Sequence, residues 1–389
     1  MALDYDLTEE QNLTRRAVRD FAEREIAPVA QELDEREEFS VELTQKMARI
    51  GLLGCCVPEK YGGADMGYVS YIIAVEELAR IDGSQAATIA AANSLGVGPI
   101  YQFGNDKQKA EWLPKLCSGE MLAAFGLTEP DAGSDAGNSR TTAELKNGNW
   151  VINGKKIFIT NSACELTGVV IVQAVTGRRA EGKPELSCIL VPAGTAGFTS
   201  REMKRKMMWR ASNTGELFFD DCIVPAENLL GERGDGLHQM LATLDRGRLS
   251  IAAVGLGGCQ GAFELALQYA NSRIQFGRPV SSFQVNAFKL ADMSLDIEVA
   301  RNLLYKACWL LEKKRPFSVE AAMAKLYCSE AMQRCVHKAV QLHGGYGLMK
   351  DFRVERLYRD QRLLEIGEGT SEILRIVIAR NIGVAGRGM

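Results

Sequence analysis

The sequence lacks features that would place it at once in several classes of protein. No run of eighteen apolar residues occurs in its 389 residues, so we expect no segment that spans a membrane. The N-terminal stretch MALDYDLTEEQ has neither the basic nor the apolar region of a signal peptide. The formal net charge is only −3, whereas nucleic-acid-binding proteins usually carry a basic surface, which argues against a nucleic-acid partner.

Metal-site, disulfide and nucleotide-binding patterns are missing as well. The ten cysteines include no CxxC pair, and the three histidines (His238, His337 and His343) are too scattered for a metal site or a serine-type triad. Reduced thiols in the core explain the cysteines best, although a nucleophilic Cys–His pair stays open. No GxGxxG follows a strand and no GxxxxGK[ST] occurs, so neither a Rossmann site nor a P-loop is indicated.

The patterns that are present divide the chain into three parts. With 46% hydrophobic and 24% charged residues, the composition is that of a globular protein, and the length suits two or three domains. Helical periodicity dominates residues 1–122, strand and turn signals dominate residues 123–235, and helical periodicity returns over residues 236–389. We therefore predict an α+β fold, mostly α, with these three segments as domains.

The first segment has clear helix signals. Thr8 and Gln11 make a capping box that predicts a helix start, and Pro28 predicts its break or kink. Further helices are expected at about 40–52 and 70–81. The stretch from Ser84 to Val97 is small and apolar on all sides, which predicts a buried helix.

Turn and strand signals alternate in the middle segment. Asn147-Gly148 and Asn153-Gly154 are dipeptides of the kind that two-residue hairpin turns prefer, because both central positions need positive φ. β-rich runs at 150–152, 157–159, 169–175, 188–191 and 217–224 accompany them, so a small barrel-like sheet is expected. The last segment has long periodic stretches at 237–272, 283–313 and 319–342, which predict an antiparallel helix bundle.

Three glycine-rich segments suit a ligand. In the loop from Phe125 to Asp135, Gly133 permits close approach to backbone amides, as a flavin edge or a pyrophosphate would need. Residues 273–279 offer two arginines for phosphates and an aromatic ring for stacking. Residues 341–347 are a glycine-rich helix end. Each also has an ordinary structural interpretation, as a tight turn, a solvated basic loop and a helix C-cap.

A fourth segment holds three carboxylates, at Glu365, Glu368 and Glu372, just before an apolar helix that Thr370 or Ser371 can cap. Glu368 is flanked by glycines and could project from a loop into a cavity. Burial there would raise its pKa and make it a general base near neutral pH. The alternative is simple complementarity between acidic residues and a helix N-terminus.

In this order and on this frame, these segments resemble the acyl-CoA dehydrogenase family, and in particular its short-chain, butyryl-CoA-type members. The resemblance covers nearly the whole chain, and six strings in register make it highly specific. They are Pro58-Glu-Lys-Tyr-Gly-Gly63, Leu127-Thr-Glu-Pro-Asp-Ala-Gly-Ser-Asp135, Ile157-Phe-Ile-Thr-Asn161, Arg273-Ile-Gln-Phe-Gly277, Gln341-Leu-His-Gly-Gly345 and Glu368-Gly-Thr-Ser-Glu372. The resemblance implies an N-terminal helical domain, a middle β-barrel-like domain and a C-terminal four-helix bundle.

The resemblance also implies non-covalently bound FAD. The residues that would line or contact the flavin, some of them also the thioester, are Phe125, Leu127, Thr128, Gly133, Ser134, Phe158 and Thr160. Relatives often have Trp at the position of Phe158, so stacking is kept here but an indole donor is lost. Thr370 and Glu372 of the C-terminal segment would also contact FAD. The residues that would contact the FAD of a neighbouring subunit are Arg273, Phe276, Gln284, Gln341 and Gly345. A shared cofactor implies a homotetramer, a dimer of dimers.

The implied reaction is α,β-dehydrogenation of an acyl-CoA. Glu368 matches the catalytic base, which would take the α-proton while the β-hydrogen leaves as hydride to flavin N5, and an electron-transfer flavoprotein would accept the electrons. Some relatives carry the base at the position of Gly247, which has no side chain here. The residues expected around the substrate are Ser134, Asp245, Arg248, Gly367 and Gly369.

The substrate and the direction of the reaction stay open. Many relatives have Tyr where this chain has Gly367, so the pocket should be wider and could take a branched or alicyclic acyl group as well as a straight short chain. An acyl-CoA oxidase, an enoyl-CoA reductase and a non-catalytic DNA-binding relative are the alternatives on the same fold. The N-terminal sequence favours a bacterial cytoplasmic protein over a mature protein of the mitochondrial matrix.

Overall fold

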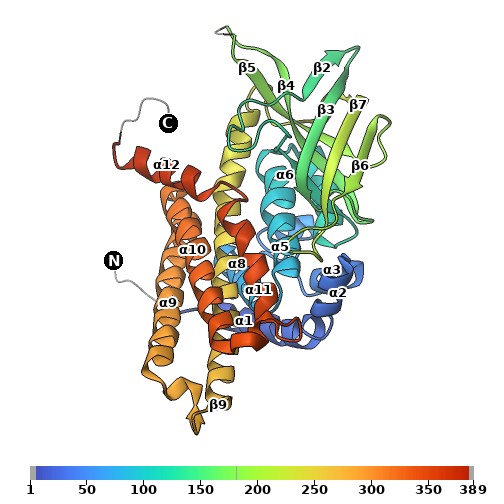
Figure 1. The fold of residues 1–389 in the computed structure, drawn as a ribbon. Coiled ribbons are helices and arrows are strands. Elements are labelled where there is room, and N and C mark those ends of the chain that lie inside the picture. The colour runs from blue at the N-terminus through green and yellow to red at the C-terminus, as the bar shows by residue number, and fades with distance from the viewer. Residues whose placement is uncertain (1–5, 181, 385–389) are drawn as a thin grey trace.

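The computed structural model describes residues 6–180 and 182–384, and its elements follow the predicted order of helices, strands and helices (Figure 1). The helices of the first part are α1 Glu9–Phe21, α2 Ala30–Arg36, α3 Val41–Arg49, α4 Tyr68–Ile81, α5 Gly83–Ala91, α6 Gly98–Phe103 and α7 Asp106–Cys117. The capping box at the start of α1 is confirmed, since Gln11 N donates to Thr8 Oγ1 (3.2 Å) and Thr8 N donates to Gln11 Oε1 (3.0 Å). After Phe21 a π-helical turn ends at Ile26, so the helix stops before Pro28 as predicted.

The stretch predicted to be buried on all sides is confirmed with one exception. α5 continues into a π-helical turn, Ala92–Val97, and every residue from Gly83 to Val97 is buried apart from Leu95, which is half-buried. Single π-helical turns inside helices often mark functional sites. Leu95 is therefore a residue to follow into the candidate site.

The middle segment folds into an eight-stranded sheet with the strand order β6-β7-β3-β2-β4-β5-β8, and β1 pairs in parallel with β4. Its strands are β1 Leu122–Gly126, β2 Thr142–Lys146, β3 Asn149–Thr160, β4 Thr167–Arg178, β5 Pro184–Pro192, β6 Phe198–Glu202, β7 Thr214–Pro225 and β8 Leu229–Leu230. Alternate side chains of β4 enter two different cores: Val169 and Ile171 pack toward α6 and α7, whereas Val170 and Val172 fill the interior of the sheet. The predicted β domain is confirmed.

One of the two predicted hairpin turns is wrong. Asn147-Gly148 does join β2 to β3, with positive φ at both residues (51° and 78°). Asn153-Gly154 instead lies inside β3, at a register shift against β7. The Asn153 amide pairs with Asp221 on β7, and a Cβ on Gly154 would collide with Thr141. The glycine is thus needed for close approach at a β-bulge rather than for a turn.

The last part is the predicted helix bundle. Its elements are α8 Gly236–Ser272, α9 Gln284–Glu312, α10 Ser318–His343, α11 Val354–Asp360 and α12 Ser371–Asn381, with a two-stranded hairpin of β9 Ile274–Gln275 and β10 Arg278–Pro279 between α8 and α9. α8 runs through the centre of the molecule and packs closely on α4. Glycine is needed at positions 257 and 261 for this close packing, because a Cβ atom at Gly257 or Gly261 would overlap the Glu76 or Arg80 carbonyl. One described helix, α8, is long and apolar enough to cross a membrane by composition alone (mean hydropathy 1.3), but 78% of that stretch is buried as in a core helix.

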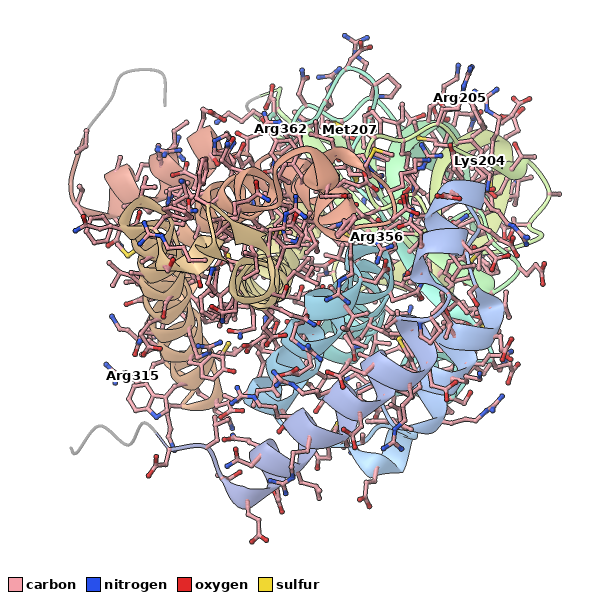
Figure 2. The ribbon with its side chains drawn as sticks, turned by 60° about the horizontal axis from the view of Figure 1, so that its bottom comes forward. Lys204, Arg205, Met207, Arg315, Arg356 and Arg362 are labelled. Atoms are coloured by element: carbon pink, nitrogen blue, oxygen red, sulfur yellow. The ribbon has the colours of Figure 1, made fainter. Side chains whose placement is uncertain are left out.

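Buried charged side chains join the three parts. Arg356 of α11 lies 3.4 Å from Asp82 at the start of α5, and Arg359 pairs with Asp34 of α2 at 2.6 Å. Asp360 accepts a hydrogen bond from the backbone of Trp209 in the β domain (2.8 Å). In Figure 2, Met207 lies where the C-terminal helices meet the β domain, and Arg356 lies where they meet the helices of the first part. Contacts from all three parts therefore fix the position of the segment that follows α11.

Candidate active site

Glu368 lies in the short segment that joins α11 to α12. The segment turns sharply, with φ of 52° at Glu368 and 100° at Gly369. Thr370 then caps α12 by accepting a hydrogen bond from Ile373 N (3.3 Å), as the sequence predicted. A left-handed φ at a residue other than glycine is uncommon, and it persists only where surrounding contacts impose it. Such strain is found mostly at functional sites.

The carboxylate of Glu368 is turned into the protein. Its Oε2 atom is buried and has no hydrogen-bond partner among the described residues. Burial raises the pKa of Glu368 to about 7, and the positive charges of Lys325 and Arg248 act in the opposite direction. A carboxyl group with a pKa near 7 can take up a proton from a weak carbon acid at physiological pH. The sequence-based expectation of a buried, basic Glu368 therefore agrees with the geometry.

Gly247 of α8 lies directly against this carboxylate. An added Cβ would overlap Glu368 Oε2 and would lie 3.1 Å from Glu368 Cδ and 3.3 Å from Leu95 Cδ2. The structure thus brings together Leu95 of the π-helical turn, Gly247 of α8 and the carboxylate of Glu368. An apolar wall faces the acid on one side, which accounts for its desolvation.

Arg248 and Asp245 lie one turn apart on the same helix. Arg248 is only 5% exposed, and its Nη1 atom lies 2.5 Å from Asp245 Oδ1. Its guanidinium also borders Gly369, since a Cβ there would lie 3.9 Å from Arg248 Nε and Nη2. Arg248 therefore belongs to the surroundings of the base. An added Cβ on Gly367 would be in ordinary van der Waals contact with Leu363, at 3.5 Å.

The loop after β1 forms a second part of the site. Phe125 and Leu127 are buried, Thr128 is half-buried, and Gly133 and Ser134 are exposed. No atom lies within 4 Å of where a Cβ on Gly133 would be. The Ile157 amide donates to Thr128 O (2.9 Å), which ties this loop to β3 next to Phe158.

A buried ion pair that the sequence did not point to supports the same loop. The Lys156 ammonium, fully buried, donates to Glu129 Oε1 (2.7 Å) and to Leu127 O (3.0 Å). Burial opposes ionisation of Glu129, but the Lys156 ammonium and the hydrogen bonds around it bring its pKa down to about 2. The only signal in the sequence is the strand period, which places Lys156 on the inward face together with Trp150 and Ile152.

Phe158 is unusual for an aromatic residue in a strand. It is 63% exposed, has φ of 61°, and lies in a second register shift between β3 and β7. Thr160 is half-buried two residues further along β3. An exposed aromatic ring on a strained backbone, beside a loop with an open glycine at Gly133, fits a planar aromatic ligand.

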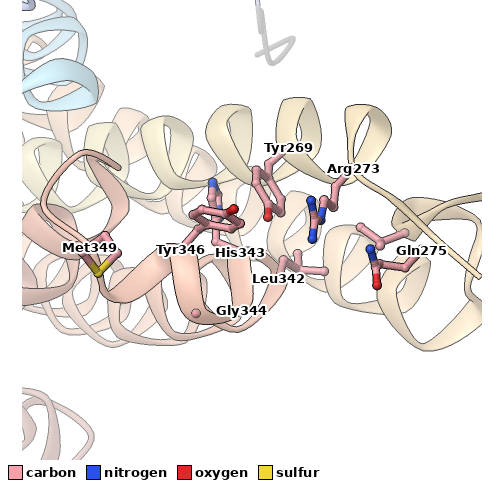
Figure 3. A pocket seen from close by; sticks show the side chains of 10 residues that line it. Tyr269, Arg273, Gln275, Leu342, His343, Gly344, Tyr346 and Met349 are labelled. Carbon is pink, nitrogen blue, oxygen red and sulfur yellow. The ribbon is translucent and has the colours of Figure 1, made fainter.

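The remaining predicted cofactor residues lie at the other end of the bundle, near β9 (Figure 1). Arg273 and Gly345 line an open groove of about 590 Å³, together with Tyr269, His343 and Tyr346 (Figure 3). Phe276 is 93% exposed at the hairpin tip, and Gln284 and Gln341 are exposed. In Figure 1 this end lies opposite α12, so one subunit does not bring these residues together with Phe158 or Glu368.

Comparison with known proteins settles what kind of protein carries these features. Models of the N-terminal, middle and C-terminal domains of acyl-CoA dehydrogenases match residues 8–120, 124–222 and 234–383. A probable acyl-CoA dehydrogenase of Bacillus subtilis, YngJ, is 49% identical over 98% of this chain and 100% of its own length. The chain belongs to the acyl-CoA dehydrogenase family.

Other members of the acyl-CoA dehydrogenase family are similar over the same length. The short-chain specific acyl-CoA dehydrogenase of Clostridium acetobutylicum is 44% identical over 98% of this chain and 100% of that protein. The structure of butyryl-CoA dehydrogenase from Megasphaera elsdenii superposes with a TM-score of 0.94 at 40% identity, covering 98% of this chain and 100% of the other. A structure from work on the electron transferring flavoprotein of Acidaminococcus fermentans gives a TM-score of 0.95 at 40% identity with the same coverage.

Membership of the acyl-CoA dehydrogenase family makes this chain an FAD-dependent oxidoreductase that acts on acyl-CoA. The exposed ring of Phe158, the open space beside Gly133 and the capped helix behind Thr370 fit such a cofactor. Binding of FAD therefore accounts for features, such as the exposed ring of Phe158, that the protein's own packing does not require.

Proposed function

We propose that this chain dehydrogenates a short-chain acyl-CoA to the 2-enoyl-CoA, with Glu368 as the base that takes the α-proton. One observation carries this proposal: the Oε2 atom of Glu368 is buried without a hydrogen-bond partner among the described residues, against Gly247 and Leu95, and burial raises the pKa of the carboxyl group to about 7. FAD supplies the acceptor for the hydrogen that leaves the β-carbon as hydride. A base of this pKa next to an apolar wall suits removal of a proton from carbon.

The chain's own residues would place the substrate and keep water away. Leu95 and the backbone of Gly247 form the wall against which the α- and β-carbons would lie. The Glu368 amide, presented by its left-handed backbone, would donate to the thioester carbonyl and make the α-carbon more acidic. Correct orientation of the reacting groups can contribute about 7–11 kcal/mol to the lowering of the barrier.

We also propose that FAD is shared between subunits of a homotetramer. On one subunit it would contact Phe125, Leu127, Thr128, Gly133, Ser134, Phe158, Thr160, Thr370 and Glu372. On its neighbour it would contact Arg273, Phe276, Gln284, Gln341 and Gly345. The support is that the second set is exposed at the end of the bundle opposite α12 (Figure 1). Light scattering of the holoprotein tests the oligomeric state. A Phe276→Asp variant should lose FAD and should no longer form the tetramer.

The acyl group is expected to be short. The relatives described as short-chain specific and as butyryl-CoA dehydrogenase support this expectation. Gly367 places no side chain next to the base, so a branched or alicyclic acyl group is the alternative. Anaerobic reduction of the bound flavin by butyryl-, 2-methylbutyryl- and octanoyl-CoA tests the range. Fastest reduction by octanoyl-CoA would reject the short-chain proposal.

The electron acceptor proposed is an electron-transfer flavoprotein, which the similar structure from Acidaminococcus work supports. That structure comes from work on flavin-based electron bifurcation, so an enoyl-CoA reductase is the second candidate. Turnover with purified flavoprotein compared with aerobic peroxide formation separates a dehydrogenase from an oxidase. We propose a bacterial cytoplasmic location, because the relatives named above are bacterial.

A further inference from the structure

Two buried side chains of α10 hold the segment that carries Glu368. Lys325 and Ser329 are one helical turn apart, and both are 0% exposed. Lys325 Nζ donates to Gly369 O at 2.6 Å. Ser329 Oγ lies 2.7 Å from Lys325 O in its own helix and 2.9 Å from Leu364 O, so these two acceptors share its single proton. The two contacts bracket the strained segment, one on each side of Glu368. Hydrogen bonds of this kind are what a left-handed residue needs to stay in place.

The hydrogen bond to the Gly369 carbonyl does not by itself explain why a charged lysine is buried at position 325. Burial of an ammonium group costs several kcal/mol unless an opposite charge faces it, and a neutral donor would serve the carbonyl equally well. Burial lowers the pKa of Lys325 to about 8, with Glu368 raising it, Arg248 lowering it and Glu372 raising it. Glu372 is exposed to solvent, which screens its charge. Glu368 is therefore the effective counter-charge.

The remaining groups that act on Glu368 do not replace Lys325. Arg248 on α8 also favours the carboxylate, but its guanidinium already pairs with Asp245 at 2.5 Å. Tyr71 on α4 faces the same region and donates its hydroxyl to Ala90 O (3.0 Å). Among the described residues these are the ionisable groups that act on the acid from α4, α8 and α10.

We propose that Lys325 is a positioning residue for Glu368: it fixes the segment through Gly369 and places a positive charge beside the carboxylate. This inference rests on the proposed function, since it concerns the same base. Without the charge, the carboxylate would ionise only at higher pH. Without the hydrogen bond, the backbone of Glu368 and Gly369 would relax.

Three variants separate these roles. Lys325→Met removes both the charge and the hydrogen bond, Lys325→Gln keeps a donor without charge, and Ser329→Ala is a matched control on the same face of α10. For each holoprotein the pH dependence of flavin reduction by butyryl-CoA is measured, together with the thermal midpoint. The pH dependence of 2-enoyl-CoA binding, seen as a shift of the flavin absorption band, provides a reading that needs no turnover.

The midpoint of flavin reduction should rise by about one pH unit or more in both Lys325 variants, because a neighbouring opposite charge typically lowers a carboxyl pKa by about 1–3 units. Product binding should follow the same shift. Ser329→Ala should lower the thermal midpoint and leave the pH midpoint unchanged. If Lys325→Met does not fold, Lys325→Gln decides the question.

A structural role alone predicts a different result. Both Lys325 variants and Ser329→Ala would then lose thermal stability, and all would keep the wild-type pH midpoint, which would overturn the inference. Failure of the proposed function is recognised separately. In that case butyryl-CoA would not reduce the flavin of the wild-type protein, or would reduce it equally well in Glu368→Gln.

Discussion

The burial of Glu368 predicts the pH at which this protein becomes active. Its pKa, raised to about 7 by burial, lies above the ordinary value of 4.5. The difference, roughly 2.5 units at about 1.4 kcal/mol each, corresponds to about 3 kcal/mol in favour of the protonated acid. Only the ionised carboxylate can take up the α-proton. The rate should therefore fall as pH drops below 7.

Stopped-flow reduction of the bound flavin by butyryl-CoA, measured anaerobically from pH 5.5 to 8.5, tests this prediction. The apparent second-order rate constant reports the free enzyme, so it should be half-maximal near pH 7 and about tenfold lower at pH 6 than its plateau. Glu368→Gln keeps the shape of the side chain and removes its basicity. It should reduce the rate by at least about a hundredfold while an enoyl-CoA still binds.

The same shift has a consequence for stability with a definite sign. Between pH 4.5 and 7 the folded protein binds the Glu368 proton more tightly than the unfolded chain does. The free energy of unfolding should therefore decrease as pH rises through this window, by at most about 3 kcal/mol from this group, and Glu368→Gln should lack that decrease. A half-maximal rate near pH 4.5, or an identical stability profile in Glu368→Gln, would refute the reasoning.

Three further predictions follow from single contacts. Gly247→Ala puts a Cβ where the Glu368 carboxylate lies, so turnover should fall at least tenfold while FAD content, read from the visible spectrum, stays normal. Asp360→Asn keeps the acceptor for Trp209 N. Burial and the nearby Asp82 raise the pKa of Asp360 to about 7, so urea unfolding should show the wild type losing up to about 3 kcal/mol of unfolding free energy between pH 5 and pH 8, a loss that the variant should lack. Lys156→Met leaves Glu129 buried without its cation, which should lower the free energy of unfolding by about 3–5 kcal/mol. The thermal midpoint and the retention of FAD on gel filtration should therefore both fall, and adding Glu129→Gln should restore part of the loss.

Elements with a strong local signal could be predicted from the sequence. Thr8 and Thr370 cap their helices because a side-chain oxygen three residues before a free amide needs no tertiary contact to act. The small and apolar stretch from Ser84 to Val97 is expected to be buried, and all of it is except the half-buried Leu95. Glu368 was identified from its glycine neighbours and from the family resemblance, and its desolvation follows from long-range contacts with Gly247 and Leu95.

Features that depend on a partner far away in the sequence could not be predicted. Asn153-Gly154 has the same letters as a hairpin turn, but Thr141 and Asp221 on neighbouring strands make it a bulge. The partners of Lys156 and Lys325, which are Glu129 and the Gly369 carbonyl, are far away in the sequence and are seen only in the structure. In both cases the local pattern is compatible with two structures, and tertiary contacts select one.

Several residues assigned to the site are costly to the fold. Glu368 has a left-handed backbone and an unpartnered carboxylate atom, Lys325 is a buried cation, and Phe158 exposes a ring from a left-handed strand residue. Behind them α8 and α4 approach so closely that only glycine fits at positions 257 and 261. A rigid core of this kind can hold strained groups that would relax elsewhere. Substitutions that relieve the strain, such as Glu368→Gly or Phe158→Gly, should therefore stabilise the fold. The same variants should lose catalysis (Glu368→Gly) or FAD (Phe158→Gly).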